Sequence, residues 1–390
     1  MICIFINKQV DIYSVFLIMK ILEVIPALSS GGAERFVVDL CNQMSKDGYE
    51  VTLMTMKDFS LANYGFYKDE VSQEVRQINL GLGKFNILTF WKLFKAIKGV
   101  RCDVVHMHLS GPYFSVLAIL FDRNKKYVVT CHNQAENEKA NNPIRFYVKN
   151  LCLKFDLMKQ VAISHQNAKS IEEVYWVPPV KLIYNGRATM GVTEEFEDTK
   201  RQIEFYKSTP LTKVFTLIAR CSTQKNIPRL IRCFNQLIAS GEDVTLLIIG
   251  NGYDSSEISP IVKQANPSIH FLGQKHNIAD YLSCSDFFTL SSDYEGMPIT
   301  LIEALGCGCI PVGTPVSGFN DVVEDGKTGF VATDFSDEAY LDALKRAIVN
   351  RDKISKEDLK TLYESKLSMV ACAHHYEELF LNHTSDRKIL

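Results

Sequence analysis

The feature that most constrains the fold of this chain is an alternation of two patterns that begins at Met19. Short apolar runs rich in β-branched residues, such as Ile21–Ala27 and Val244–Ile249, are typical of parallel strands whose sheet is covered on both faces. Longer stretches between such runs, for example Ala33–Met44 and Ile227–Ala239, carry apolar residues at helical spacing. This alternation predicts an α/β fold built on doubly wound, mostly parallel sheets.

The alternation stops between Gly186 and Pro210, where polar and acidic residues gather without a strand-like run, and then resumes. At 390 residues the chain is too long for one ordinary hydrophobic core. We therefore predict two Rossmann-like domains, over residues 19–185 and 186–365, that face each other across a ligand-binding cleft. A last helix, at about residues 366–385, is expected to pack back on the first domain.

Residues 1–18 are apolar but interrupted by Lys8 and Asp11, so no run approaches the ~20 residues of a membrane-spanning helix. No small-residue cleavage site follows them. We expect them to be an extension upstream of the first domain, with an interfacial anchor as the alternative. The 11 cysteines are scattered without metal-ligand spacing, which is typical of reduced thiols in a cytoplasmic protein.

The stretch most informative about function, Ser291–Gly306, follows a strand-like run and contains a helix start. Pro298 suits the first position of that helix, so Glu295 lies in the loop before it. The amides of Gly296, Met297 and their neighbours would then lack intrahelical partners and could bind a phosphate or sugar hydroxyls.

Glu303 is the only charged residue between Ile299 and Cys309, in a segment that is otherwise apolar or small. Burying a carboxylate is costly unless the carboxylate is paired. Two vicinal ribose hydroxyls could satisfy it, and so could a backbone or arginine partner.

A pair of cations follows the strand-like run Lys213–Ala219. Arg220 and Lys225 combine a fork-shaped guanidinium with a compact ammonium at a strand end, which suits a diphosphate leaving group. A solvated basic loop is the alternative interpretation.

Further strand ends carry candidate residues in the first half of the chain. Gly31 and Gly32 precede a helix and would let the backbone approach a ligand closely, although the third glycine of a dinucleotide fingerprint is missing. His132 follows another strand-like run, where it is either a ligand contact or a locally satisfied loop histidine. His106 and His108, on one face of a strand, are expected to be structural or acceptor-side, and no metal is assigned to them.

The segment SSDYEGMPITLIEALGCGCIPVGT, in which seven residues separate two glutamates, resembles the signature of glycosyltransferase family 4, whose fold is the two-domain GT-B fold. The resemblance implies that Glu295 lies beside the donor sugar and that Glu303 binds the ribose of the nucleotide. The segment LIARCSTQKN is similar to the family's diphosphate clamp, although Ala219 and Cys221 depart from the usual pattern. The donor-binding residues that the resemblance implies are Gly31, Gly32, Arg220, Lys225, Gln274, Lys275, Glu295, Gly296, Met297, Pro298 and Glu303.

The resemblance also implies a reaction, the retaining transfer of a hexose-type sugar from a nucleoside-diphosphate sugar to a glycan or lipid-linked glycan acceptor in surface-polysaccharide biosynthesis. No catalytic nucleophile is evident, so we expect a front-face route in which the leaving phosphate accepts the acceptor's proton. Positioning and charge stabilisation by Glu295, Arg220, Lys225 and His132 would carry catalysis, with His132 contacting the donor sugar. Neither a metal nor another cofactor is expected, since the cations stabilise the leaving group.

The acceptor side is expected in the first half, which is basic: residues 84–159 contain 13 Lys and Arg against 5 Asp and Glu. The whole chain has a net charge of −2 and shows no nucleic-acid signal. Ile87–Arg101 carries apolar residues at helical spacing and lysines mostly on the other side, so it could lie on an anionic membrane. An ordinary half-buried helix is the alternative. Under the membrane interpretation the acceptor is a polyprenyl-diphosphate glycan, and the protein is cytoplasmic and attached to the inner face of the cell membrane.

Three other functions fit parts of the pattern. A nucleotide-sugar epimerase or an inverting GT-B transferase would share the fold. Asp293, Tyr294 and Glu295 imitate the metal-binding acidic triplet of a GT-A enzyme, against which stand the tandem α/β units and the Arg220–Lys225 clamp. A non-catalytic sugar-nucleotide-binding assembly protein is the alternative of another class, although each family position carries a chemically competent residue.

Overall fold

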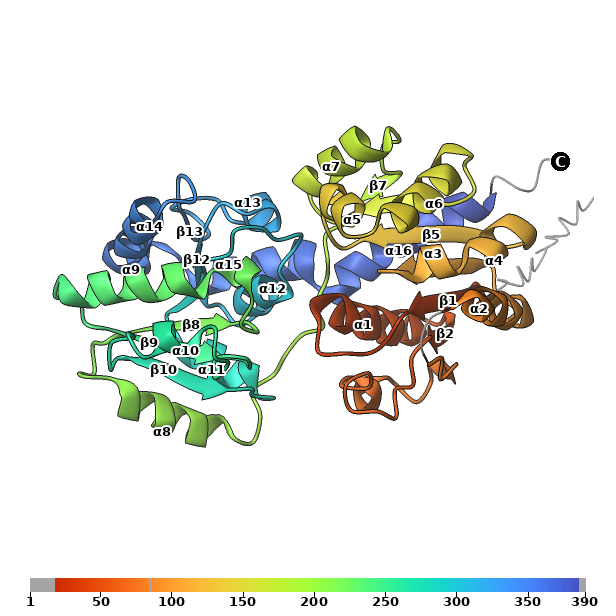
Figure 1. The fold of residues 1–390 in the computed structure, drawn as a ribbon. Coiled ribbons are helices and arrows are strands. Elements are labelled where there is room, and N and C mark those ends of the chain that lie inside the picture. Colours follow the sequence, from red (N-terminus) through yellow and green to blue (C-terminus); the bar gives the residue numbers. More distant parts are fainter. Residues whose placement is uncertain (1–17, 84–85, 386–390) are drawn as a thin grey trace, which may run out of the picture.

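The computed structural model describes residues 18–83 and 86–385, which form two α/β domains side by side (Figure 1). The predicted fold class is therefore confirmed. Almost the whole 1–18 segment, including Lys8 and Asp11, lies outside the described residues. Within the described part of the chain, no helix is long and apolar enough to cross a membrane.

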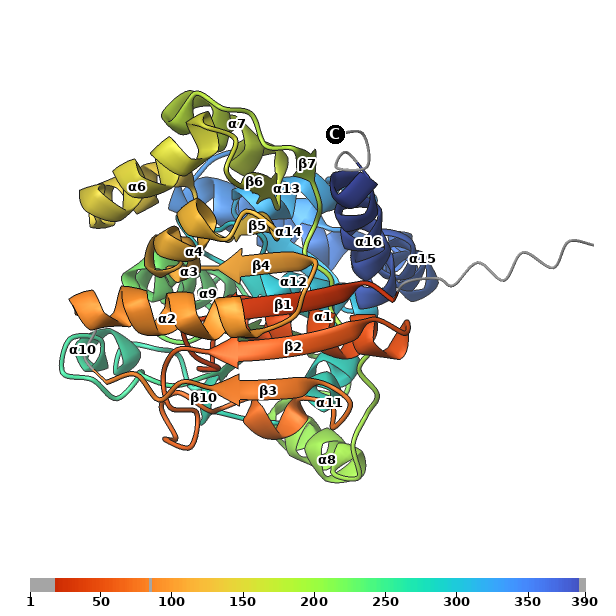
Figure 2. The same ribbon diagram turned by 90° about the vertical axis from the view of Figure 1, so that its right-hand side faces the viewer.

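The first domain contains a seven-stranded sheet in the order β3-β2-β1-β4-β5-β6-β7, in which all neighbouring strands are parallel. The strands lie side by side in Figure 2, from β3 at the bottom upward. Leu22 and Val24 of β1 are buried in one core, and Ile21 and Ile25 in the core on the opposite face, so both faces are covered. The strands are β1 (Lys20–Ile25), β2 (Glu50–Thr55), β3 (Arg76–Asn79), β4 (Val104–His108), β5 (Lys126–Cys131), β6 (Lys159–Ala162) and β7 (Lys181–Leu182).

The helices of the first domain cover this sheet on both faces. The face of Leu22 and Val24 packs against residues of α2 and α6, and the opposite face packs against α1. The helices are α1 (Gly32–Lys46), α2 (Ile87–Gly99), α3 (Gly111–Phe114), α4 (Val116–Phe121), α5 (Ala135–Asn141), α6 (Pro143–Lys154) and α7 (His165–Tyr175).

The second domain contains a six-stranded parallel sheet in the order β10-β9-β8-β11-β12-β13. Strands β9 and β11 are buried along their whole length, as the continuous apolar runs predicted. The strands are β8 (Lys213–Ile218), β9 (Val244–Ile249), β10 (Ile269–Gly273), β11 (Phe287–Leu290), β12 (Ile310–Gly313) and β13 (Phe330–Val331).

A helix that the sequence did not predict occupies part of the interval between Gly186 and Pro210. This helix, α8 (Phe196–Tyr206), packs against α11 and buries only Thr199 and Ile203. Such a sparse apolar stripe gives a weak helical signal. The other helices of this half are α9 (Ile227–Ala239), α10 (Ser259–Val262), α11 (Ile278–Cys284), α12 (Ile299–Gly306), α13 (Ser317–Val322), α14 (Asp337–Asn350) and α15 (Lys356–Leu362).

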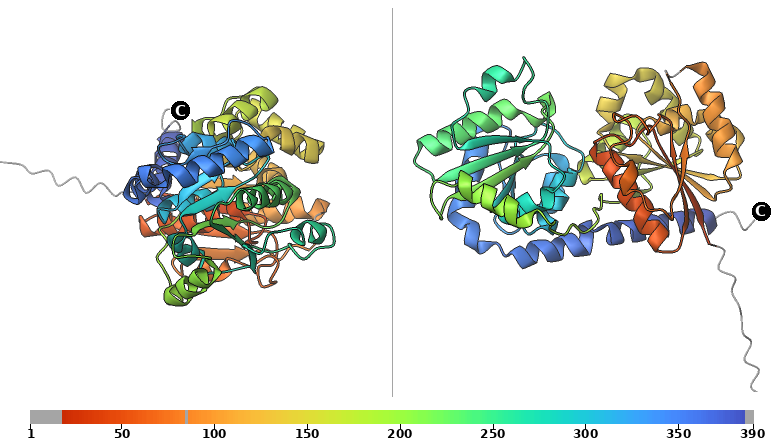
Figure 3. Two further views of the ribbon diagram at one scale, coloured as in Figure 1. Left: turned by 90° about the vertical axis from the view of Figure 1, so that its left-hand side faces the viewer. Right: turned by 90° about the horizontal axis from the view of Figure 1, so that it is seen from below.

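The last helix, α16 (Met369–Ser385), leaves the second domain and runs along the first (Figure 3, right). Tyr376 of this helix is hydrogen-bonded to Thr130 of β5 at 2.7 Å. Lys181 of β7 donates to Glu378 at 2.7 Å. The C-terminal helix therefore contributes side chains to the core of the first domain. The boundary between residues 185 and 186 stays a prediction.

Candidate active site

Loops that follow strands of the two sheets meet between the domains. Gly32, after β1, lies so close to Ile299 that an added Cβ would be 3.3 Å from the Cγ1 of that residue. Gly296 lies against the backbone of His132, and a Cβ at position 296 would be 2.7 Å from the carbonyl oxygen of His132. Because real Cβ atoms do not approach this closely, position 296 requires glycine. The predicted donor loop and His132 are therefore neighbours.

The start of α12 differs by one residue from the prediction. Pro298 is the residue that caps the helix, with extended backbone angles, and Ile299 is the first helical residue. The correction moves the helix start away from Glu295 by one position but keeps the loop before it. Among the described residues, the amides of Gly296 and Met297 donate no hydrogen bond. This loop thus offers two backbone donors to a ligand, as the sequence predicted.

Lys225 and Glu295 form an ion pair within the second domain. Lys225 ends a short 3-10 turn after β8, and Glu295 lies in the loop after β11. Ser292 donates to the same carboxylate oxygen, Oε1, at 2.9 Å. Glu295 is 8% exposed, so an ammonium and a hydroxyl hold its carboxylate in one place. Two residues that the family resemblance assigns to the donor are thereby brought together.

Arg220, the other cation of the predicted clamp, follows β8 and is exposed. No hydrogen bond or ion pair to its guanidinium comes from the described residues. Burial raises the pKa of Glu34 in α1, and the charge of Arg220 opposes this rise. The carboxylate of Glu34 folds over Gly31, where any Cβ would collide with it. Arg220 thus faces the Gly31–Gly32 turn of the first domain with its guanidinium free for an anion.

Glu303 is buried, as predicted, but it is not the unpaired carboxylate that a ribose alone would satisfy. Arg187 donates from Nε to Glu303 Oε1 at 2.7 Å and from Nη1 to Asp39 Oδ2 at 2.6 Å. Burial raises the pKa of Glu303, and Arg187 counteracts the rise. The arginine partner left open by the sequence is therefore present. It comes from the segment between the two sheets and joins α1 to α12.

Glu303 and Lys275 line a cavity of about 290 Å³ that is formed by both halves of the molecule. From the first domain, Phe66 stacks on His276 with ring centroids 5.8 Å apart and planes at 14°. Gln274 lines a different cavity, of about 590 Å³, beside the turn after β9. Lys275 and Glu303 therefore line one cavity, whereas Gln274, the neighbour of Lys275 in the chain, lines another.

A third cavity, of about 390 Å³, lies in the first domain beside Asn133, the residue after His132. Arg145 of α6 lines it and lies over the rings of Tyr113 and Phe114, 5.5 and 5.3 Å from their centroids. Among the described residues, Arg145 has no acidic partner within ion-pair distance. The lining of this cavity is mixed: apolar side chains such as Leu109 and Phe146 lie beside the ion pair of Lys149 with Glu138, and Arg145 adds a further cation.

His132 is held by a buried chain of polar side chains behind β4 and β5. Its Nε2 lies 3.0 Å from Nδ1 of His108, whose Nε2 lies 2.8 Å from Glu23 Oε2. Glu23 also accepts from His106 Nδ1 at 3.1 Å. Burial alone would raise the pKa of Glu23, but His106 and His108 lower it to about 2. The structural interpretation of His106 and His108 fits these contacts.

Metal-ligating atoms gather at two places in the described chain, around Glu23, His106 and His108 and around His374, His375 and Glu378. The first group is buried and its nitrogens are engaged in the hydrogen bonds given above, whereas the second is largely exposed. Neither group includes a residue of the Lys225–Glu295 site. The expectation that the reaction needs no metal stays a prediction.

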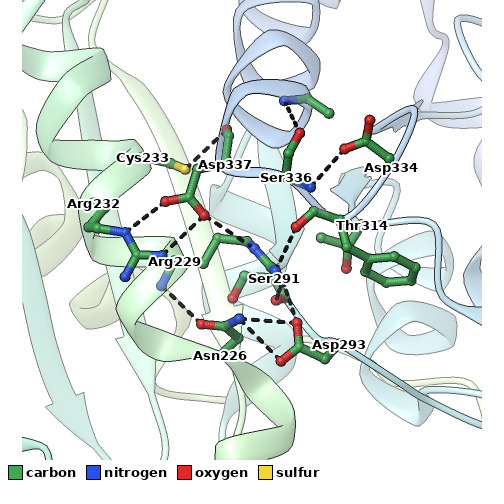
Figure 4. A network of polar contacts seen from close by, with 12 residues as sticks. Asn226, Arg229, Arg232, Cys233, Ser291, Asp293, Thr314, Asp334, Ser336 and Asp337 are labelled. Carbon is green, nitrogen blue, oxygen red and sulfur yellow. Dashed lines mark hydrogen bonds and ion pairs between the residues drawn. The ribbon is translucent and has the colours of Figure 1, made fainter.

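Arg229, which the sequence analysis missed, fixes the loop that carries Glu295 (Figure 4). This buried residue of α9 donates to the carbonyl of Ser291 at 3.0 Å and to Asp293 at 2.7 Å. Asp337 lies 3.5 Å from Nε of Arg229, while Asp293 also accepts from Asn226. Arg229 thus holds both ends of the turn. Asp293 is committed to this network, which leaves the acidic triplet of the GT-A alternative without a free first member.

Glu23 and Arg187 were also missed by the sequence analysis. Glu23 could have been found, since it is the only charged residue of β1 after Lys20, the first residue of that strand. Arg187 lies in the irregular segment between the sheets, where no periodic pattern marks a buried residue.

Comparisons with known proteins agree with this geometry. The family model for group 1 glycosyl transferases matches residues 198–377, and that for glycosyltransferase family 4 matches residues 30–189. An N-acetylgalactosaminyltransferase of Campylobacter jejuni, named for a diphospho-undecaprenol acceptor, is 26% identical over 345 residues, 85% of this chain and 90% of that protein. The N-acetyl-alpha-D-glucosaminyl L-malate synthase of Bacillus anthracis is 23% identical over 78% of this chain and 81% of that protein.

Solved structures show the same fold. HepE of Anabaena, in complex with UDP and glucose, superposes with a TM-score of 0.77 at 16% identity, over 93% of this chain and 100% of that one. A sucrose-phosphate synthase of Thermosynechococcus elongatus gives a TM-score of 0.77 at 17% identity, over 94% and 100% of the two chains. Both sheets, both family matches and the site between the domains lead to one conclusion: the chain belongs to the group 1, family 4 glycosyltransferases of the GT-B fold.

Proposed function

We propose that this glycosyltransferase transfers a hexose-type sugar from a nucleoside-diphosphate sugar to a glycan or lipid-linked glycan, with retention of anomeric configuration. The proposal rests on one observation: Lys225, Glu295 and the backbone amides of Gly296 and Met297 lie together in the second domain. Among the described residues, these two amides donate no hydrogen bond. Arg220 adds an unpaired guanidinium from the end of β8. These groups suit a diphosphate joined to a sugar.

In the proposed reaction, the bond between the anomeric carbon and the diphosphate oxygen breaks while the acceptor oxygen bonds to the same carbon from the same face. The proton of the acceptor hydroxyl passes to the leaving phosphate. Arg220 and Lys225 stabilise the negative charge that develops on the diphosphate, and the helix start of α12 adds its amides. Glu295 faces the sugar, and Glu303 faces the ribose in the cavity shared with Lys275.

The anomeric configuration of the product tests this proposal. Proton NMR of a fresh reaction should show a product with the anomeric configuration of the donor. An inverted product would establish the inverting GT-B alternative, and an epimerised nucleotide sugar without acceptor would establish the epimerase alternative. Full activity in EDTA is expected, and loss of activity restored by Mg²⁺ or Mn²⁺ would overturn the metal-free mechanism. Donor binding without turnover for any acceptor would favour the assembly protein.

The acceptor proposed here carries a polyprenyl diphosphate. The cavity beside Asn133 offers Arg145, which has no acidic partner among the described residues, next to apolar side chains such as Leu109 and Phe146. Because Glu138 in the same lining is neutralised by Lys149, this arrangement suits an anionic group next to a lipid chain. The Campylobacter jejuni relative is named for an acceptor of this kind. Comparing turnover of one glycan as the polyprenyl diphosphate and as the free sugar tests the choice. Equal turnover would contradict it.

We also propose that the first domain rests on an anionic membrane. Helix α2 is half-buried through Leu93 and Ile97, but Trp91 is 51% exposed. The neighbouring helices α4 and α6 expose further apolar side chains. Lys95 lies over the ring of Trp91, so cations and apolar groups alternate on this surface. The exposed apolar residues of the surface are Ile87, Leu88, Trp91, Leu120, Phe121, Ile144, Tyr147, Leu151 and Phe155.

Liposome flotation tests this surface. The protein should float with vesicles that contain anionic lipid and stay behind with neutral vesicles, because both cations and apolar groups are needed. The double variant Trp91→Ser/Phe121→Ser should lose flotation. Phe205→Ser, which removes an aromatic side chain exposed on α8 of the second domain, is the matched control. Absence of wild-type binding to either vesicle would overturn the proposal.

A further inference from the structure

A chain of three side chains, from three adjacent strands, runs behind the active site. Glu23 lies on β1, His108 ends β4 and His132 follows β5. Glu23 and His108 are fully buried, and the steps between neighbouring residues are 2.8 Å and 3.0 Å. Each of these distances is that of a hydrogen bond.

The direction of each hydrogen bond follows from the chemistry of Glu23. An ionised carboxylate can only accept, so the Nε2 of His108 must carry the hydrogen that it donates. In a neutral imidazole the other nitrogen, Nδ1, is then an acceptor. Since His108 Nδ1 faces His132 Nε2, the hydrogen between them belongs to His132.

The protonation states agree with this direction. The pKa of Glu23 is about 2, so the carboxylate is ionised at neutral pH. Burial and the neighbouring His106 lower the pKa of His108 to about 4, which leaves its imidazole neutral. Burial also lowers the pKa of His132 well below its ordinary value.

A second branch of contacts fixes the carboxylate itself. His106 donates to Glu23 from Nδ1, and its Nε2 lies 2.8 Å from Thr130 Oγ1. Thr130 in turn is bonded to Tyr376 of α16 at 2.7 Å. Two imidazoles on β4 therefore bind the carboxylate of Glu23, which restricts its rotation away from His108.

We propose that Glu23 and His108 are positioning residues that hold His132 as the Nε2–H tautomer, so that its bare Nδ1 accepts a hydrogen bond from a hydroxyl of the donor sugar. Among the described residues, Nδ1 of His132 has no other partner. The backbone of His132 touches Gly296, the neighbour of Glu295, which places the ring beside the proposed sugar site. The part of the inference that concerns the sugar rests on the proposed function, whereas the tautomer does not.

The tautomer is measured on the protein without substrate. In ¹⁵N-labelled protein, long-range ¹H–¹⁵N spectra distinguish protonated from bare ring nitrogens, and the loss of one ring system in His132→Asn assigns the signals. We expect His132 to show a protonated Nε2 and a bare Nδ1 at neutral pH. A protonated Nδ1 on His132 would overturn the inference, whatever reaction the enzyme performs.

Removing the carboxylate tests the positioning role. The amide of Glu23→Gln donates on one side, and a donor facing His108 reverses the hydrogen bonds along the chain. We expect part or all of the His132 signal to change to the Nδ1–H tautomer, with a fall in kcat/KM for the donor of about tenfold. An unchanged tautomer in a folded Glu23→Gln protein would refute the role of Glu23. Should this variant not fold, the wild-type spectrum and the His132 variants still decide.

Two substitutions of His132 test which of its two ring nitrogens contacts the sugar. The amide oxygen of His132→Asn comes near the position of Nδ1, whereas the amide of His132→Gln comes near Nε2. We expect His132→Asn to keep activity within about threefold of wild type and His132→Gln to lose about tenfold. His374→Gln, on the exposed face of α16, is the matched control. If transfer with retention is observed but His132→Gln is the more active variant, the sugar contact of Nδ1 is wrong and the proposed function stands.

Discussion

Two groups of polar contacts near the interdomain region, one in each half of the molecule, differ in kind. In the first domain, the imidazoles of His132 and His108 and the carboxylate of Glu23 form a buried chain in which each hydrogen bond has a direction. In the second, full charges meet in pairs, Lys225 with Glu295 and Arg229 with Asp293. A directional chain can present one acceptor in one orientation. An ion pair can exchange a partner for a ligand of the same charge without leaving a buried charge alone.

This difference indicates a division of labour between recognition and charge stabilisation. The imidazole chain suits the recognition of a sugar hydroxyl through a hydrogen bond, because a hydroxyl has no net charge. The paired cations suit a diphosphate, which brings its own negative charges. Arg187 joins the two domains independently of both systems, because it binds Asp39 of the first domain and Glu303 of the second.

The largest expected effect breaks this junction. Arg187→Met leaves Asp39 and Glu303 buried without their shared cation, and the free energy of unfolding should fall by about 3–5 kcal/mol. Urea denaturation followed by circular dichroism measures the change. Adding Glu303→Met to the same chain should restore part of the loss, because the carboxylate left without a cation is removed, whereas Asp39 keeps its ion pair with Arg35. A single variant as stable as the wild type would show that the junction is not structural.

The next effect concerns the charges of the second domain alone. Lys225→Ala removes the cation that pairs with Glu295 and faces the proposed leaving group, and kcat should fall by about 10²–10³-fold. Steady-state kinetics with a saturating donor measures this, with melting temperature as the check on folding. Lys327→Ala removes a surface lysine paired with Glu324 and serves as control. Equal turnover in the two variants would remove Lys225 from the mechanism.

Acid should act on the two halves with opposite sign. The pKa of His108 is about 4 in the folded protein and 6.5 ordinarily. Below pH 6.5, His108 of the unfolded chain therefore binds a proton that His108 of the folded protein does not bind. Its contribution to stability is therefore present above pH 6.5 and falls, by at most about 3 kcal/mol, as the pH approaches 4. The raised pKa of Glu303 contributes in the other direction, favouring the folded state as the pH falls.

Urea denaturation at several pH values measures the net dependence. In His108→Asn, the fall in stability between pH 6.5 and pH 4 should be smaller than in the wild type. An unchanged pH dependence in this variant would mean that His108 is not held neutral by the fold.

The smallest expected effect concerns Phe66, which the first domain contributes to the cavity beside Glu303. Phe66→Ala removes the ring stacked on His276, and the KM for the donor should rise by about threefold with kcat unchanged. Tyr206, which stacks on His270 away from this cavity, supplies the matched variant Tyr206→Ala, for which no change in KM is expected. A change in kcat rather than KM in Phe66→Ala would assign the ring to domain closure.

Much of the fold could be predicted because the local periodicity of apolar residues indicates most strands and helices. The bounds of α9 and β9 agree with the prediction to the residue. The elements that were not predicted include two with little apolar content, the polar edge strand β3 and the sparsely buried α8. Local patterns carry no signal for such elements, since tertiary contacts stabilise them.

The candidate site divides in the same way. The burial of Glu303 was predicted from its apolar neighbours, but its partner Arg187 lies 116 residues away along the chain. The pairing of Lys225 with Glu295 likewise spans 70 residues. Contacts of this kind depend on how the elements pack, which no single segment of the sequence encodes.

Helix α16 has a consequence for the order in which the molecule is made. The first sheet is complete in sequence once β7 has been synthesised, at Leu182, but Tyr376 and Phe380 of its core belong to a helix near the C-terminus. On the ribosome, the side chains that α16 adds to this core therefore become available only after the entire second domain has been synthesised. Domains usually fold as they emerge. Here the core of the earlier domain lacks these side chains until the later one is finished, and a chain that stopped before Met369 would never receive them.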